Sequence, residues 1–177
     1  MAVEAAVRQQ QLPTSKKNSP QPQQLSLRGR ALRLLGRREF SRQELENRLR
    51  GYADAGNPEE LAMLMNDLAE RGWLSDARYA EAVVRKRTGQ YARRSIAQEL
   101  KSAGVAVEVT DAALAPVDPD EEFTAALALC QRKFRHAPID QKEKARQIRF
   151  LQTRGYSFGL ALRVMKQLAL SGESQSV

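Results

Sequence analysis

Apolar residues recur along most of this chain at intervals of three and four positions, the spacing that places side chains on one face of an α-helix. Five stripes have this period: Leu27, Ala31, Leu34 and Leu35; Leu61, Leu64, Met65 and Leu68; Tyr79, Ala82 and Val83; Phe123, Ala126, Leu127, Cys130 and Phe134; and Phe158, Ala161, Leu162, Met165 and Leu168. Residues 105–109 alone alternate like a strand, but a lone strand would have nothing to pair with. We expect a loop there, leading into a short helix through Val109, Ala112 and Ala113.

Residues that begin and end helices flank these stripes. Three can cap a helix N-terminus, and two of them have the capping-box acid three positions on: Ser41 with Glu44, Asp140 with Glu143, and Ser75. Three glycines lie where a left-handed residue would end a helix: Gly72, Gly104 and Gly155. Trp73, next to Gly72 at a helix end, could lie in the core or form an exposed anchor, and we expect the core.

One segment of the sequence occurs twice. Residues 40–50 align with residues 91–101 without a gap, each with an aromatic residue, a small residue, an arginine and an apolar pair four positions apart. A weaker third copy runs through Ala145, Ile148 and Leu151. Each copy has one helix before it and one after it, which predicts an all-α fold of tandem three-helix repeats stacked into an elongated, curved body. Because each unit is small, we expect neighbouring units to complete its core.

These repeats divide the chain into three units and two tails. We expect repeat 1 over residues 25–74, repeat 2 over 75–117 and repeat 3 over 118–170. Residues 1–24 are rich in Gln and Pro and offer little to bury, which predicts a disordered tail. We expect a flexible tail at 171–177.

The chain is strongly basic and has little catalytic chemistry. Its 29 Lys and Arg against 21 Asp and Glu give a net charge of +8, which favours an anionic partner. Its one cysteine, Cys130, lies on an apolar stripe and is predicted to be a buried thiol, and the one histidine, His136, cannot form a metal site with it. We expect a cytoplasmic monomer that needs no cofactor, does not span a membrane and is not an enzyme.

The arginines cluster where the first and second helices of a unit meet. Stacked units would align these clusters into a basic stripe suited to forked contacts with carboxylates or phosphates. The candidate partner-binding or DNA-binding residues are Arg37, Arg38, Arg42, Arg85, Lys86, Arg87, Arg93 and Arg94, together with Arg154. The alternative is an ordinary solvated surface with salt bridges within helices, such as Glu44 with Arg48.

Four ordered motifs resemble those of the RecX family of regulatory proteins. They are Leu35-Gly36-Arg37-Arg38-Glu39-Phe40-Ser41 with Glu44-Leu45 and Leu49; Gly72-Trp73-Leu74-Ser75-Asp76-Ala77-Arg78-Tyr79-Ala80; Arg93-Arg94, Ile96, Glu99-Leu100-Lys101 and Gly104-Val105; and Arg154-Gly155-Tyr156. The likeness runs from about Leu27 to Leu168. The departures are Ser75, where the family often has Asp, and Gly36, where a bulkier residue is usual.

The resemblance implies a partner that composition and spacing do not. Members of the family bind the RecA recombinase filament in its groove and lower its ATPase, strand-exchange and co-protease activities, in the control of recombination, DNA repair and the SOS response. The resemblance also implies weaker, non-specific contact with single- and double-stranded DNA. The rival reading is a stand-alone DNA-binding module, such as a helix-turn-helix transcription regulator, which three-helix units also permit. Such a reader would bind duplex alone, with a steep salt dependence.

Overall fold

The computed structural model describes residues 25–53, 57–118, 121–134 and 136–173. Within these ranges the chain forms α-helices and one 3-10 turn, and no strand. Unit 1 comprises α1 (Leu27–Leu35), α2 (Arg42–Leu49), the 3-10 turn η1 (Arg50–Tyr52) and α3 (Pro58–Glu70). Unit 2 comprises α4 (Asp76–Arg87), α5 (Arg93–Ser102) and α6 (Val107–Leu114), and unit 3 comprises α7 (Glu121–Phe134), α8 (Gln141–Gln152) and α9 (Phe158–Glu173).

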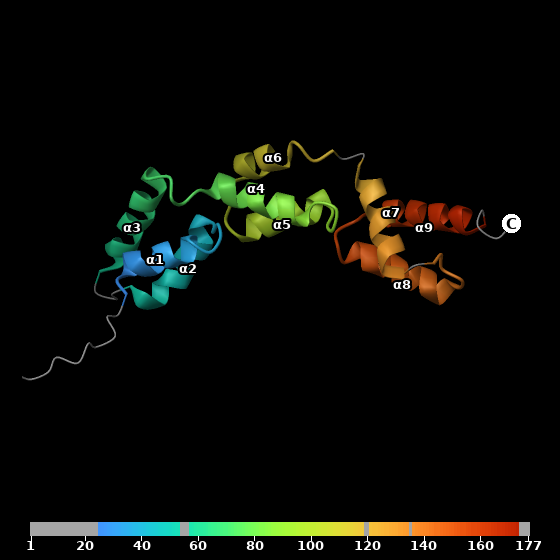
Figure 1. Ribbon diagram of the computed structural model, residues 1–177, viewed down its shortest axis with the longest axis horizontal. Coiled ribbons are helices and arrows are strands. Elements are labelled where there is room, and N and C mark those ends of the chain that lie inside the picture. Colours follow the sequence, from blue (N-terminus) through green and yellow to red (C-terminus); the bar gives the residue numbers. More distant parts are fainter. Residues whose placement is uncertain (1–24, 54–56, 119–120, 135, 174–177) are drawn as a thin grey trace, which may run out of the picture.

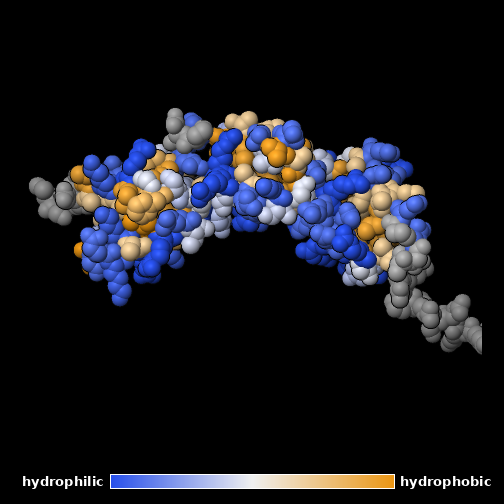
Figure 2. Space-filling view, turned by 180° about the vertical axis from the view of Figure 1, so that it is seen from behind, coloured by the Kyte–Doolittle hydropathy of each residue, from blue (hydrophilic) through white to orange (hydrophobic). Residues whose placement is uncertain are grey.

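The three units follow one another along the long axis of the molecule (Figure 1). Seen from behind, the surface forms an arch in which hydrophilic residues surround an apolar patch on each unit (Figure 2). The predicted all-α fold of tandem three-helix repeats in an elongated, curved body is therefore confirmed. No helix in the described ranges has the length and apolar character needed to cross a membrane.

Local signals in the sequence account for several of the helix starts and ends. The Ser41 and Ser75 hydroxyls and the Asp140 carboxylate accept hydrogen bonds from backbone N–H groups three residues on, at 3.0, 3.3 and 2.6 Å. Gly72, Gly104 and Gly155 have positive φ angles of 68°, 77° and 88°, as a left-handed helix end requires. The segment 105–109 has no strand, because α6 begins at Val107.

The core is divided rather than shared. Buried apolar residues form three separate clusters: one from Leu27 to Leu74, one from Tyr79 to Leu114, and one from Ala126 to Leu168 that also takes in Ala92. Every pair of helices with extensive contact belongs to one unit. The expectation that neighbours complete each other's core was wrong except at Ala92, because three crossing helices enclose a small core by themselves.

Trp73 differs from the prediction as well. Its side chain is 43% exposed, and it is the next residue, Leu74, that enters the core of unit 1. The Arg28 and Arg71 guanidinium carbons lie 5.6 and 5.7 Å from the Trp73 ring, and both arginines form ion pairs with Asp67. The αL turn at Gly72 points the indole outward, where two cations contact it.

The two predicted tails fall mostly outside the described residues. Residues 1–24 and 174–177 lie there entirely. Helix α9 continues to Glu173, so residues 171–173, which the prediction gave to the C-terminal tail, are helical.

Candidate functional site

Successive units are joined by the ends of their middle helices. At the first joint, the Ser41 hydroxyl donates to the Ala103 carbonyl at 2.7 Å, and the Arg42 backbone N–H donates to the Asp76 carboxylate at 2.7 Å. Gly104 lies against Gln43: a Cβ added to the glycine would be 2.2 Å from the glutamine Oε1. Unit 1 thus places the start of α2 against the turn that ends α5.

The second joint repeats this arrangement with equivalent residues. The Ala92 N–H donates to the Arg154 carbonyl at 2.9 Å, and the Arg93 N–H donates to the Glu122 carboxylate at 2.7 Å. Gly155 lies against Ser95, so that an added Cβ would be 2.7 Å from the serine Cβ. In both joints, an acid from the first turn of the next unit accepts a hydrogen bond from a backbone N–H group at the start of a helix in the preceding unit. Such an N–H group has no partner within its own helix.

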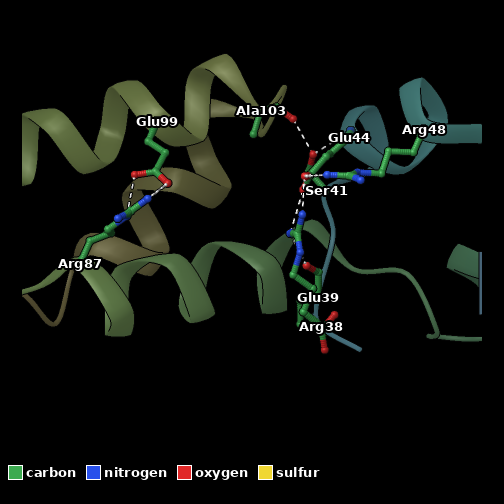
Figure 3. A network of polar contacts seen from close by, with 8 residues as sticks. All are labelled: Arg38, Glu39, Ser41, Glu44, Arg48, Arg87, Glu99 and Ala103. Carbon is green, nitrogen blue, oxygen red and sulfur yellow. Dashed lines mark hydrogen bonds and ion pairs between the residues drawn. The ribbon is translucent and has the colours of Figure 1, made fainter. Parts of the chain in front are cut away.

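Five of the nine predicted site residues take part in these joints or in ion pairs beside them. Arg38 forms a bidentate contact with Glu44, at 2.5 and 3.0 Å, and its guanidinium carbon lies 3.8 Å from the centre of the Phe40 ring. This hydrogen bond with Glu44 raises the pKa of Arg38. The capping-box acid therefore pairs with an arginine of its own unit rather than with the N–H of Ser41 (Figure 3).

Arg87 has a similar role in unit 2. Its guanidinium group donates to both carboxylate oxygens of Glu99, at 2.8 and 2.9 Å, and so ties the end of α4 to α5 (Figure 3). The hydrogen bond with Glu99 raises the pKa of Arg87. Two of the nine cations that the sequence assigned to a partner, Arg38 and Arg87, are therefore neutralised by a carboxylate of their own unit.

Arg93, Arg42 and Arg154 also bind groups of this chain. The Arg93 guanidinium donates to the Leu114 carbonyl and, at 3.1 Å, to the Val117 carbonyl, which holds the end of α6. Arg42 donates to the Asn66 amide oxygen at 2.7 Å. Arg154 donates to the Phe150 carbonyl at 3.2 Å and stacks on the Phe150 ring at 3.8 Å.

The other four predicted residues are exposed: Arg37, Arg85, Lys86 and Arg94. Among the described residues none of their side chains has a hydrogen bond or ion pair. Cations without a local acid keep their charge available to an external anion. They are the members of the predicted set best placed to contact a partner.

One groove brings together parts of the two basic clusters. Arg38, Lys86 and Arg87 line a groove of about 470 Å³ between units 1 and 2. Glu39, Glu44 and Glu99 also line it, so its positive and negative groups balance and Lys86 remains the unpaired cation of its lining. The structure brings Arg38 together with Lys86 and Arg87, whereas Arg37, Arg85 and Arg94 lie outside this groove. Sequence reasoning missed the neutralising role of Glu99, twelve residues from Arg87, because the pairing depends on how α4 and α5 cross.

Nucleophilic and metal chemistry have little support in the described residues. Burial raises the pKa of the Cys130 thiol to about 11, as expected for a core cysteine. His136 is exposed, with Nδ1 3.9 Å from the Glu143 carboxylate. No group of three or more His, Cys, Asp or Glu side chains in the described part of the chain could hold a metal ion.

Comparisons with known proteins identify what the chain is similar to. Residues 75–114 match the model of the second three-helix domain of RecX, and residues 120–165 match that of the third. The chain is 42% identical over 144 residues to the regulatory protein RecX of Leptothrix cholodnii, covering 81% of this chain and 89% of the relative. It is 41% identical over 133 residues to that of Neisseria meningitidis serogroup A, covering 75% and 84%.

A solved structure agrees on the fold. The crystal structure of RecX from Lactobacillus salivarius matches with a TM-score of 0.64 at 19% identity, covering 81% of this chain and 95% of that one. The tandem arrangement of three-helix units is thus found in an experimentally determined relative of low identity.

Proposed function

This chain belongs to the RecX family of regulatory proteins, and on that premise we propose that it binds the RecA nucleoprotein filament. Binding lowers the filament's ATP hydrolysis, strand exchange and co-protease activity, and so restrains recombination and DNA repair in the cytoplasm. A ligand shifts an equilibrium only through its different affinities for two states. The chain therefore holds one state of the filament more tightly than another, as a monomer and without catalysis of its own.

The observation that carries this proposal is the elongated body with two equivalent joints. A filament offers the same surface again and again along its length. A body whose units follow one another in tandem can contact more than one subunit at once, whereas a compact domain cannot. We take the units as residues 25–74, 75–117 and 118–170.

The four exposed cations, Arg37, Arg85, Lys86 and Arg94, are the proposed contacts with acidic groove surface or with the filament's DNA. The other five predicted residues, Arg38, Arg42, Arg87, Arg93 and Arg154, hold the units in shape. Their contribution to binding is indirect, because their guanidinium groups already have partners in this chain.

The test is ATP hydrolysis by RecA on single-stranded DNA, with this protein titrated in below the RecA concentration. Strong loss of hydrolysis at a small molar ratio supports action on the filament, because competition for DNA would need far more protein. If hydrolysis falls only when the protein saturates the DNA, the stand-alone DNA-binding module is the better reading.

A matched pair of variants tests the proposed contacts. Arg85→Glu with Lys86→Glu reverses two exposed charges that have no partner in the described chain, so the fold should be kept and inhibition lost. Arg132→Glu with Lys133→Glu makes the same change in net charge on exposed residues of α7. Equal inhibition by both variants would show that the end of α4 is not a contact surface.

A further inference from the structure

Unit 1 carries a cleft lined by three arginines. Arg30 and Arg33 lie one turn apart on α1, and Arg37 follows just beyond its end. Together with Tyr52 and the apolar side chains of Leu34 and Leu49 they line a cleft of about 300 Å³. This lining contains no carboxylate.

The lack of acids sets these arginines apart from most other arginines of unit 1. Each of five other arginines there lies within 4.0 Å of a carboxylate: Arg28, Arg38, Arg48, Arg50 and Arg71. Within the described chain, the side chains of Arg33 and Arg37 have neither a hydrogen bond nor an ion pair, and both are exposed. The charges of this cleft are therefore uncompensated.

Arg30 and Tyr52 are arranged beside the two free arginines. Arg30 Nε donates to the Leu25 carbonyl at 3.1 Å, and its guanidinium carbon lies 4.2 Å from the centre of the Tyr52 ring. Tyr52 is 60% exposed, so much of its ring is open to solvent. An exposed aromatic ring beside a row of cations is the combination that binds unpaired nucleic acid, with bases on the ring and phosphates on the guanidinium groups.

We propose that this arginine cleft binds a single strand of DNA, with Arg33 and Arg37 on successive phosphates and a base stacked on Tyr52. A duplex would present phosphates but keep the faces of its bases covered, which leaves the ring without a role. An acidic peptide would engage the arginines but gains less from an exposed tyrosine. The proposal deepens the proposed function, since it assigns unit 1 to the strand and leaves the cations of unit 2 to the recombinase.

The experiment measures binding of the full chain to a fluorescein-labelled oligo-dT by fluorescence anisotropy, without RecA, over a series of salt concentrations. Arg33→Glu with Arg37→Glu should weaken binding at least tenfold. It should also lower the slope of log affinity against log salt by about 1.4, because each phosphate contact on a single strand contributes about 0.7. Tyr52→Ala should weaken binding about fivefold or more, while Tyr52→Phe, which keeps the ring, should bind like the parent.

Arg132→Glu with Lys133→Glu is the control for net charge and should leave most of the binding intact. The proposal is overturned if this control loses as much affinity as the cleft variant, since that would be a general charge effect. It is also overturned if the cleft variant keeps its DNA affinity but loses affinity for RecA alone, because the cleft would then bind acidic protein. Because RecA is absent from the main measurement, its result is independent of the filament assay.

Discussion

Replacing Gly155 by alanine tests the close contact between units 2 and 3. Gly155 has a φ of +88°, a conformation that costs an L-residue about 1–2 kcal/mol. The new Cβ would also lie 2.7 Å from the Ser95 Cβ and 3.3 Å from the Ser95 backbone nitrogen. Both atoms belong to the first turn of α5, which cannot move without moving the helix.

The expected loss is the sum of these two effects. Overpacking of this kind costs about 1–3 kcal/mol. Gly155→Ala should therefore destabilise the protein by roughly 2–5 kcal/mol. Gly72→Ala is the matched control, because Gly72 has a φ of +68° but nothing within 4 Å of an added Cβ. It should lose only about 1–2 kcal/mol.

Urea unfolding followed by far-ultraviolet circular dichroism measures both variants. Trp73, the single tryptophan, lies in unit 1 and gives a second, local signal. Because the three cores are separate, Gly155→Ala should shift the circular dichroism transition more than the tryptophan transition. Gly72→Ala lies in unit 1 beside Trp73, so it should shift the tryptophan transition more than the circular dichroism transition.

A second substitution separates the clash from the backbone strain. Ser95→Gly removes the Cβ that the new methyl group would meet, so it should restore part of the stability lost in Gly155→Ala, once its own effect is subtracted in a double-mutant cycle. Equal losses in Gly155→Ala and Gly72→Ala, with no coupling to Ser95, would refute the reasoning that the joint needs a residue without a side chain.

Three further predictions concern single groups. A double-mutant cycle with Arg87→Ala and Glu99→Ala should give a coupling of only about 0.5–1 kcal/mol, since both side chains are about one-third exposed and solvent screens the pair; a coupling near zero would mean that the bidentate contact is not kept in solution. Burial raises the pKa of Cys130 to about 11 from an ordinary 9. The stability that the buried thiol contributes is therefore fully present below pH 9 and is lost as the pH rises through about 11. Cys130→Ala should show a shallower fall in urea midpoint over that window, and an identical fall would contradict burial of the thiol. Iodide should quench Trp73 fluorescence in the folded protein, because the indole is 43% exposed; protection as complete as that of a core tryptophan would return Trp73 to the core.

The helices and their ends could be predicted from the sequence because they depend on neighbours within one turn. Ser41 and Asp140 cap their helices through N–H groups three residues away, and Gly104 and Gly155 end theirs in the left-handed region. Local spacing contains all of this information.

The site could be predicted only in part, because pairing between helices is not local. From the sequence, Arg38, Arg87 and Arg94 were all predicted to belong to one basic stripe with the same role. The structure pairs the first with Glu44 and the second with Glu99, and leaves the third exposed. The dipole of a helix start explains an acid such as Glu122 equally well, yet its carboxylate accepts from Arg93, 29 residues away. Trp73 was predicted to lie in the core for a related reason. The spacing of apolar residues does not show which of two neighbours after a left-handed turn, Trp73 or Leu74, faces the core.

Because the outer units extend away from the two joints, a small change of angle at a joint causes a larger displacement at the far end of a unit. Helix α9 has 16 residues and is therefore about 24 Å long. A tilt of about 10° at a joint would move the far end of such a helix by about 4 Å, which is more than the length of a hydrogen bond. Residues that form a joint, such as Gly104 and Asp76, thus set the positions of cations in the neighbouring unit. A substitution there can therefore displace distant cations although the cations themselves are unchanged in the sequence.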